Sequence, residues 1–294
     1  MKIPCEEIAA ILKKEIASEV KLLKKKHKHP QLATVLVGDS KDQLSFVASK
    51  KKIGESLGIE FNFIHYTEPP AFMRFIKRIK DLSEDPKNTA VIIQQPLPSK
   101  LYTETLYDFV SLDKEIEAHK NKSTFLSPIG QAVLTALKYA LVHKKLSKNL
   151  IINEKKDSSM FKQAMKHKKV VLLGRGKTGG HPIGETLSKF KINYINVNSE
   201  TPNADAYLKE SDVIISAVGK KIIAPENLKP GVILINVGLR REKGKLKGDY
   251  EENEIKNIAS FYTTTPKGLG PIDVLYLYKN LVESAHRQKW CKII

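Results

Sequence analysis

The feature that most constrains the fold is the alternation of short apolar segments with helical patterns along both halves of the chain. Strands that alternate with helices are typical of α/β proteins, in which the sheet is largely parallel. The sequence therefore predicts two α/β units. The apolar, β-rich segments lie at 32–38, 59–66 and 89–98 in the first half, and at 168–174, 192–197, 212–219, 231–238 and 259–263 in the second.

The formal net charge of the 294 residues is +18, but the lysines are spread over the whole chain. No stripe combines basic with aromatic residues, which argues against a nucleic-acid partner. The charge instead favours the attraction of anionic small molecules through long-range electrostatics.

Three further observations narrow the class of protein. No apolar run approaches the roughly 18 residues that a membrane span needs, and the N-terminal segment mixes charges with apolar residues, unlike a signal peptide. Cys5 and Cys291 cannot form a disulfide framework, and no Cys/His cluster has metal-ligand spacing. We therefore expect a cytoplasmic protein with no membrane partner and no metal site.

A helix is predicted between Ser40 and Gly58. Ser40 and Gln43 have the spacing of a capping box, and Gly58 is a helix-stop signal. Lys50 falls within the apolar stripe of this helix, which also contains Ile53. Lys50 could extend past the rim of the core with its amine in water. Alternatively, it is a partly desolvated amine with a lowered pKa, usable as an acid or base near neutral pH.

The strand predicted at 89–93 runs directly into Gln94 and Gln95. Open α/β sheets bind their ligands at the carboxyl ends of strands, so these amides are candidate ligand contacts. Alternatively, Gln94 and Gln95 only fill a turn and contact no ligand. Farther along, the polar, lysine-rich segment 144–169 is predicted to be a domain junction with a surface insertion.

The segment Gly174–Gly179 matches GxGxxG, follows a predicted strand and precedes a predicted helix. This setting predicts a dinucleotide site, in which glycines let the backbone approach the pyrophosphate. The residues that usually select the cofactor disagree. Glu200 favours the ribose hydroxyls of NAD, whereas Arg175 and Ser199 favour the 2′-phosphate of NADP.

In the order of these motifs, the chain resembles the bifunctional methylenetetrahydrofolate dehydrogenase/methenyltetrahydrofolate cyclohydrolase family over nearly its whole length. VGDSKDQLSFVASKKK is similar to the family's VGxxxxSxxYVxxKxK, IIQQPLP to VQLPLP, KEIEAHK to KDVDGFH and SPIG to TPxG. GRGKTGGHP is similar to GRSxxVGxP and TPKGLGPIDV to PGGVGPMTV, with DVIISAVGK and INVGLRR between them. Such a series in one order is more specific than any single motif.

The resemblance implies an N-terminal three-layer α/β catalytic domain at 1–148 and a Rossmann-type dinucleotide-binding domain at 149–271, with a final helix at 272–294 that packs back on the first domain. It also implies a homodimer that binds tetrahydrofolate derivatives in a cleft between the domains. The implied catalytic residues are Lys50, Gln94 and Glu117; the substrate contacts are Phe46, Gln95, Lys267, Gly268, Leu269, Gly270 and Pro271; the cofactor contacts are Gly174, Arg175, Gly176, Ser199 and Leu239.

The implied reaction is the oxidation of 5,10-methylenetetrahydrofolate to 5,10-methenyltetrahydrofolate with NADP or NAD, followed by hydrolysis to 10-formyltetrahydrofolate. Lys50 and Gln94 would serve the hydrolysis, because it needs a proton acceptor and then a donor. NADP is predicted over NAD, since Arg175 and Ser199 together offer a charge and a hydroxyl to a phosphate.

The chain departs from the family pattern at several of these positions. The motif tyrosine is Phe46, so a monofunctional dehydrogenase or a catalytically inactive homologue that binds folate and nucleotide is the alternative. The other departures are Gln43 for serine, Glu117 for aspartate, Ala118 for glycine, Gly176 for serine, Asn236 for aspartate, Lys267 for glycine and Asp273 for threonine.

Overall fold

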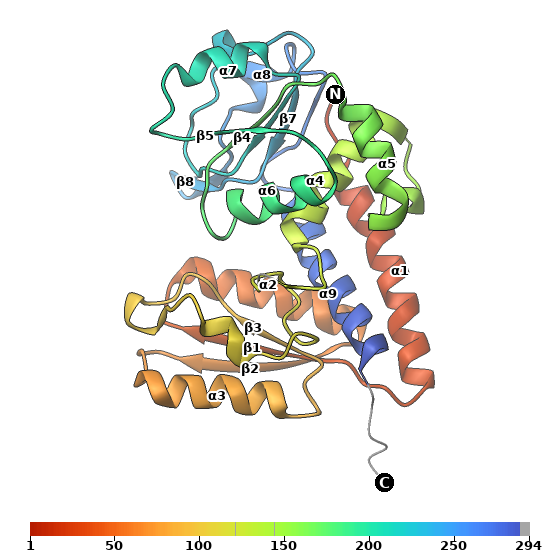
Figure 1. The fold of residues 1–294 in the computed structure, drawn as a ribbon, viewed down its shortest axis with the longest axis vertical. Helices are drawn as coiled ribbons and strands as arrows, with labels where there is room; N and C mark the ends of the chain where they lie inside the picture. Colours follow the sequence, from red (N-terminus) through yellow and green to blue (C-terminus); the bar gives the residue numbers. More distant parts are fainter. Residues whose placement is uncertain (121, 144, 289–294) are drawn as a thin grey trace. The chain divides into compact units, whose positions relative to one another are not determined.

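The computed structural model describes residues 1–120, 122–143 and 145–288, and within them the chain forms two α/β units, as predicted. One comprises Lys13–Pro128 and the chain from Val274 onward, and is called the three-strand unit after its sheet. The other comprises Met1–Leu12 and Ile129–Asp273, and is called the five-strand unit. The unit boundaries fall inside the first and last helices, α1 (Cys5–Lys25) and α9 (Gly270–Arg287) (Figure 1).

The sheet of the three-strand unit has the order β2 (Glu60–Tyr66), β1 (Gln31–Val37), β3 (Ala90–Ile93), and both pairings are parallel. The central strand β1 is buried from Leu32 onward, as its largely apolar sequence predicts. Helices α2 (Lys41–Leu57) and α3 (Phe72–Glu84) lie on opposite faces of this sheet (Figure 1).

Helix α2 ends at Gly58, whose left-handed conformation lets its N–H donate to the carbonyl of Glu55. The capping box predicted at the other end is absent, because Ser40 makes no side-chain capping bond. Gln43 Nε2 instead donates a 2.8 Å hydrogen bond to the carbonyl of Pro96. This long-range contact, which spacing along the helix cannot show, ties α2 to the loop after β3.

Helix α9 packs on the same unit through polar side chains. Asn280 Nδ2 donates to the carbonyls of Ile116 and Leu126 at 2.8 and 2.9 Å, and Ser284 Oγ donates to that of Asp113 at 2.6 Å. These bonds hold the backbone at Asp113, Ile116 and Leu126 against the helix.

The five-strand unit contains a parallel sheet in which β4 lies between β5 and β6. The strand order reverses at β4, which is the position where doubly wound sheets bind ligands. The sheet order is β10 (Phe261–Tyr262), β7 (Ile233–Asn236), β6 (Val213–Ser216), β4 (Val170–Leu173), β5 (Ile195–Val197).

The remaining elements of this unit are short. The hairpin of β8 (Arg240–Glu242) and β9 (Lys245–Lys247) is antiparallel and was not predicted. The helices are α4 (Pro128–Lys138), which a π turn continues over Tyr139–His143, then α5 (Glu154–Met165), α6 (Gly180–Lys189), α7 (Ala204–Glu210) and α8 (Glu252–Ile255).

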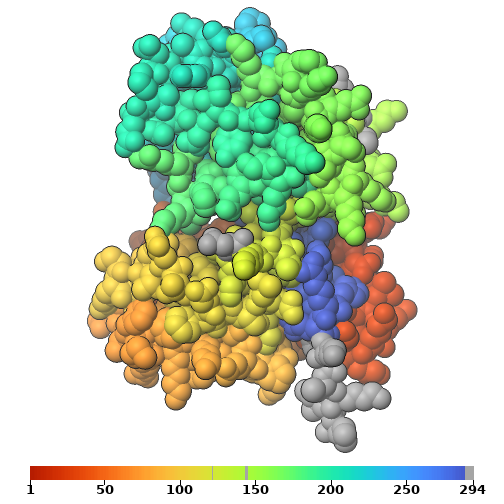
Figure 2. Space-filling view, viewed as in Figure 1, coloured from red at the N-terminus to blue at the C-terminus, as the bar shows by residue number. Residues whose placement is uncertain are grey.

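The prediction of a surface insertion at 144–169 was wrong for its central part. Helix α5 buries Asp157, Phe161 and Met165, which are spaced four residues apart and therefore share one face. Lys138 Nζ lies 2.7 Å from Asp157 Oδ2, and both side chains are buried. The lysines of α5 face outward, and side chains of this part of the chain (green) lie on the face shown in Figure 2. Within the described residues, no helix has the length and hydropathy that a membrane span requires.

Candidate active site

Lys50 is the centre of a polar cluster in the three-strand unit. Its side chain is only 4% exposed, which excludes the interpretation that its amine extends into water. Nζ donates to Gln94 Oε1 at 3.1 Å and lies 3.3 Å from Glu117 Oε1, with which it forms an ion pair. The amine also lies 4.8 Å from the centroid of the Phe46 ring, a cation–π contact. The structure thus brings together all three predicted catalytic residues and the predicted aromatic contact.

The backbone around this cluster is held from two elements. Tyr278 Oη on α9 donates a 2.6 Å hydrogen bond to the main-chain carbonyl of Lys50. The helices approach closely because Gly54 has no side chain: a Cβ there would lie 2.4 Å from Tyr278 Oη. Gln94 is fixed by its N–H, which donates to Val35 of β1 at 2.9 Å, and by its Nε2, which donates to the carbonyl of Gln95 at 2.8 Å. With Nε2 occupied in this way, Oε1 faces the amine.

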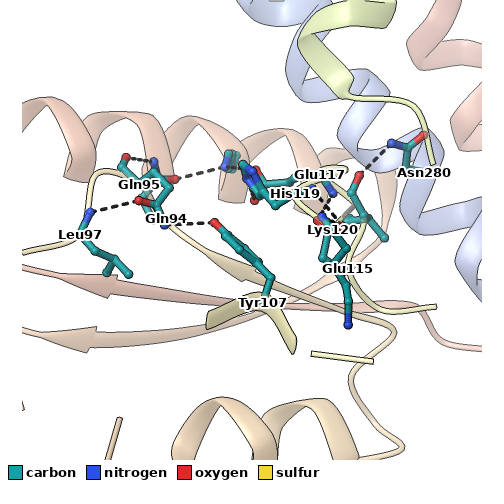
Figure 3. Close-up of polar contacts among 11 residues, drawn as sticks. Gln94, Gln95, Leu97, Tyr107, Glu115, Glu117, His119, Lys120 and Asn280 are labelled. Carbon is teal, nitrogen blue, oxygen red and sulfur yellow. Dashed lines mark hydrogen bonds and ion pairs between the residues drawn. The ribbon is translucent and has the colours of Figure 1, made fainter. Parts of the chain in front are cut away.

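A buried carboxylate shapes the loop that carries Glu117. The Glu115 side chain accepts hydrogen bonds from the N–H groups of Glu117, His119 and Lys120 at 2.9, 3.1 and 3.4 Å (Figure 3). Between them, Ala118 adopts a left-handed conformation with φ 65°, which costs about 1–2 kcal/mol for a residue with a Cβ. The bonds to Glu115 therefore maintain a turn that the sequence disfavours locally.

The charges of the cluster depend on one another. Burial opposes ionisation of Glu117, but Lys50 and His119 outweigh it and lower the pKa of Glu117 to about 2. Burial likewise tends to lower the pKa of His119, but the nearby Glu117 carboxylate outweighs it and raises that pKa above its usual value. Glu117 is therefore a carboxylate at neutral pH, placed between two basic side chains.

Two residues of this cluster were missed by the sequence analysis. Gln95 Nε2 donates to Tyr107 Oη at 3.0 Å, and the Tyr107 ring stacks on the His119 ring with centroids 4.4 Å apart (Figure 3). His119 lies in the KEIEAHK segment, so its place near Glu117 could have been found. Tyr107 lies on a 3₁₀ turn, Leu106–Phe109, that carries no sequence motif.

The predicted nucleotide turn lies in the five-strand unit, between β4 and α6. Gly174 has φ 99°, and a Cβ at Gly180 would lie 2.2 Å from the carbonyl of Gly174, so the helix start and the turn touch through backbone alone. A Cβ at Gly176 would meet nothing within 4 Å, so there is open space beside the turn. A tight turn, free space and a helix N-terminus are the features that fit a pyrophosphate.

The residues expected to select the cofactor are themselves paired. Arg175 Nη2 donates to Glu200 Oε1 at 2.8 Å, and both side chains are exposed. Ser199 is exposed next to Glu200, after β5. Leu239, the last predicted cofactor contact, is 56% exposed after β7. These side chains follow parallel strands, at the carboxyl edge of the sheet.

Asp249 supports this edge and was not predicted. Its buried carboxylate accepts hydrogen bonds from Ser216 Oγ at 2.5 Å and from the N–H groups of Val218 and Gly219 at 3.0 and 2.9 Å. Asn236 accepts from the N–H of Asp249 and donates Nδ2 to the carbonyl of Gly238. An aspartate at position 236 lacks that amide donor, so the asparagine is matched to its neighbours.

The predicted substrate loop also belongs to the five-strand unit. Gly268 and Leu269 are buried, whereas Gly270 and Pro271 are exposed at the start of α9. Lys267 is exposed and lies 3.2 Å from Glu6 Oε1. The predicted site residues thus form two groups, one around Lys50 in the three-strand unit and one in the five-strand unit.

Comparisons with known proteins place both units in one family. Residues 3–117 match the profile of the tetrahydrofolate dehydrogenase/cyclohydrolase catalytic domain, and residues 158–289 match that of its NAD(P)-binding domain. The bifunctional protein FolD of Geobacillus thermodenitrificans is 31% identical over 286 residues, which cover 96% of this chain and 95% of that protein.

Solved structures show the same fold. The bifunctional enzyme FolD of Campylobacter jejuni superposes with a TM-score of 0.85 at 24% identity, covering 97% of this chain and 98% of that one. The Trypanosoma brucei dehydrogenase-cyclohydrolase, solved with NADP and an inhibitor, superposes with a TM-score of 0.76 at 23% identity, covering 98% and 97%.

Proposed function

Because the chain belongs to the tetrahydrofolate dehydrogenase/cyclohydrolase family, we propose that it oxidises 5,10-methylenetetrahydrofolate to 5,10-methenyltetrahydrofolate and hydrolyses the product to 10-formyltetrahydrofolate. The observation that carries the proposal is the buried amine of Lys50, held between Gln94 and Glu117 within the segment that matches the catalytic domain. A buried lysine with hydrogen-bonding partners on two sides is suited to moving a proton.

In the hydrolytic step, water adds to the methenyl carbon and the ring then opens at a nitrogen. Lys50 is proposed to accept a proton from the attacking water with its amine in the neutral form, and then, as the ammonium, to return that proton to the leaving nitrogen. Gln94 orients the amine, because its Oε1 accepts from Nζ while its own Nε2 is occupied by a main-chain carbonyl. Glu117 is proposed to bind the pterin ring as well as to pair with Lys50.

In the oxidative step, the protein positions the substrate, and the nicotinamide accepts the hydride when it is bound. The turn around Gly174 and Gly176 and the start of α6 are proposed to hold the pyrophosphate, and Leu239 to contact the cofactor. Arg175 and Ser199 are proposed to bind the 2′-phosphate, which makes NADP the preferred cofactor and NAD the second choice. To do so, Arg175 must exchange its bond with Glu200 for one with the phosphate.

We assign the catalytic domain to 1–148 together with the final helix predicted at 272–294, of which 289–294 lie outside the described residues, and the nucleotide domain to 149–271. The proposed folate contacts are Phe46, Gln95 and the loop residues Lys267, Gly268, Leu269, Gly270 and Pro271. The protein is proposed to act in the cytoplasm.

A homodimer is proposed because β2 is an edge strand with an exposed aromatic side. Phe63 is 40% exposed and stacks on His65, with ring centroids 5.6 Å apart. Edge strands with apolar side chains tend to pair with another chain. Sedimentation of the wild type and of Phe63→Glu tests this: the wild type should sediment as a dimer, and the variant as a monomer.

A second candidate is a monofunctional dehydrogenase. Phe46 supports it, because the ring beside Lys50 carries no hydroxyl. Turnover of methylenetetrahydrofolate with NADP or NAD separates the candidates when the methenyl and formyl products are both followed. The proposal expects both products, with faster turnover on NADP. Methenyl product without enzymatic formyl formation supports the dehydrogenase, and no product refutes both.

A further inference from the structure

The contacts around Lys50 form a closed circuit of six residues. Gln94 and Glu117 touch the amine from two sides, as described above. From the Gln94 side chain the circuit continues to the main-chain carbonyl of Gln95, from the Gln95 side chain to the hydroxyl of a tyrosine, and through an aromatic stack to a histidine, which faces the carboxylate again. The order is Lys50, Gln94, Gln95, Tyr107, His119, Glu117 and back to Lys50.

Protonation of His119 places a second positive charge beside the Glu117 carboxylate, in addition to that of Lys50. His119 Nε2 lies 3.7 Å from Glu117 Oε2, while the other oxygen, Oε1, lies 3.3 Å from Lys50 Nζ. The stack with Tyr107 orients the imidazole, and the hydrogen bond from the main-chain N–H of His119 to Glu115 fixes the backbone that carries it. One carboxylate is thus shared by a lysine and a histidine.

We propose that His119 is a positioning residue of the folate site, which holds the Glu117 carboxylate and, by gaining or losing a proton, changes how strongly that carboxylate pairs with Lys50. The inference deepens the proposed function and rests on it for the identity of the ligand. The family motif KDVDGFH has phenylalanine where this chain has His119, so the motif itself does not assign this role.

Three charged side chains act on the His119 imidazole: Glu117, Glu115 and Lys50. Glu117 and Glu115 favour its protonated form, and Lys50 disfavours it. Tyr107 stays neutral, because burial raises its pKa. The pKa of His119 is raised above 6.5, since the neighbouring Glu117 outweighs burial. Below that pKa, the imidazolium holds Glu117; as the pH rises through it, this hold is lost and the contact with Lys50 Nζ remains.

Because Glu117 is proposed to bind the pterin ring, a carboxylate held less firmly should bind tetrahydrofolate more weakly as the pH rises through the His119 pKa, by about three- to tenfold, the order of one hydrogen bond. His119→Phe keeps the stack on Tyr107 but cannot titrate, so it should bind with the weak affinity of the high-pH form at every pH. His119→Gln keeps an uncharged donor toward Glu117, so it should bind more tightly than the phenylalanine variant, also without a pH step. His286→Gln is the control, because His286 pairs with Glu19 on the surface.

The experiment combines calorimetric titration with tetrahydrofolate between pH 6 and 9 and NMR titration of the His119 ring in wild type and Glu117→Gln. We expect the His119 pKa to fall in Glu117→Gln, and the binding step to vanish in both His119 variants but not in His286→Gln. An unchanged His119 pKa in Glu117→Gln, or a wild-type binding step in His119→Phe, overturns the inference. If the wild type binds no tetrahydrofolate at any pH, the proposed function fails, whatever the NMR titration shows.

Discussion

Tyr278 on α9 donates a 2.6 Å hydrogen bond to the main-chain carbonyl of Lys50, the residue whose amine lies at the centre of the candidate active site. The two residues are 228 positions apart, so the last helix fixes the backbone of the residue proposed to carry the proton. Its contribution is measurable, because phenylalanine removes the donor and keeps the ring.

Tyr278→Phe should lower the free energy of unfolding by about 0.5–1.5 kcal/mol, the usual net value of such a bond. It should also slow hydrolysis, because the amine is held less firmly. Urea unfolding gives the first quantity, and a methenyltetrahydrofolate hydrolysis assay gives the second. Tyr207→Phe is the matched control, since Tyr207 is 39% exposed and its change should stay within about 0.5 kcal/mol. Equal unfolding curves for both variants would show that the bond contributes nothing.

Strands β4, β6 and β7 were predictable because each is a short, largely apolar run that is buried throughout. They lie inside their predicted ranges for this reason. The β8–β9 hairpin was not predicted, because its strands are mostly charged and lie at the surface. The glycine of its turn is a weak sequence signal, because two-residue hairpin turns require positive φ. In the structure both turn residues, Lys243 and Gly244, have positive φ.

Lys50 was found because a lysine within an apolar helical stripe is unusual. Tyr107 was missed because its role depends on tertiary contacts with Gln95 and His119, whereas His119 lies two residues from Glu117 and could have been found. Local patterns also failed for Gln43, whose spacing from Ser40 suggested a cap but whose amide bonds a loop instead. Burial and periodicity can be predicted from the sequence, whereas the partner of a polar side chain is set by tertiary structure.

Cofactor preference should depend on the ion pair between Arg175 and Glu200. Arg175→Ala should lower kcat/KM with NADP by about tenfold and barely affect NAD, since one charged hydrogen bond is worth about 1.5–3 kcal/mol and this one is exposed. Glu200→Gln should raise the preference for NADP, because it frees Arg175 and removes a negative charge near the phosphate. Both ratios follow from steady-state rates with each cofactor.

Glu210→Gln provides the control for this pair, because Glu210 forms another exposed ion pair of the same unit, with Lys169. It should leave the cofactor ratio unchanged. If the wild type prefers NAD and Arg175→Ala does not alter its use of NADP, Arg175 does not bind the phosphate and Glu200 is the selecting residue.

Phe46→Tyr should raise hydrolysis more than hydride transfer. The Lys50 amine lies against the ring, so a hydroxyl at the ring's far end would reach a bound water or the substrate rather than the amine. One such bond, made only in the transition state, is worth about 0.5–1.5 kcal/mol, or roughly two- to tenfold in rate. The measurement is kcat/KM for each step. Equal changes in both steps, or slower hydrolysis, would show that the site is adapted to phenylalanine.

The most direct test of the central claim is hydrolysis of methenyltetrahydrofolate by Lys50→Met compared with Lys51→Met. The two lysines are neighbours on α2, but Lys51 is half-exposed and faces Glu55 at 3.9 Å. Methionine keeps much of the apolar stem and removes the amine. Lys50→Met should hydrolyse the methenyl compound at least about 10²-fold more slowly than wild type, the scale typical of acid–base groups, while Lys51→Met should be unaffected. Hydrolysis by Lys50→Met at the wild-type rate would show that the Lys50 amine does not carry the proton.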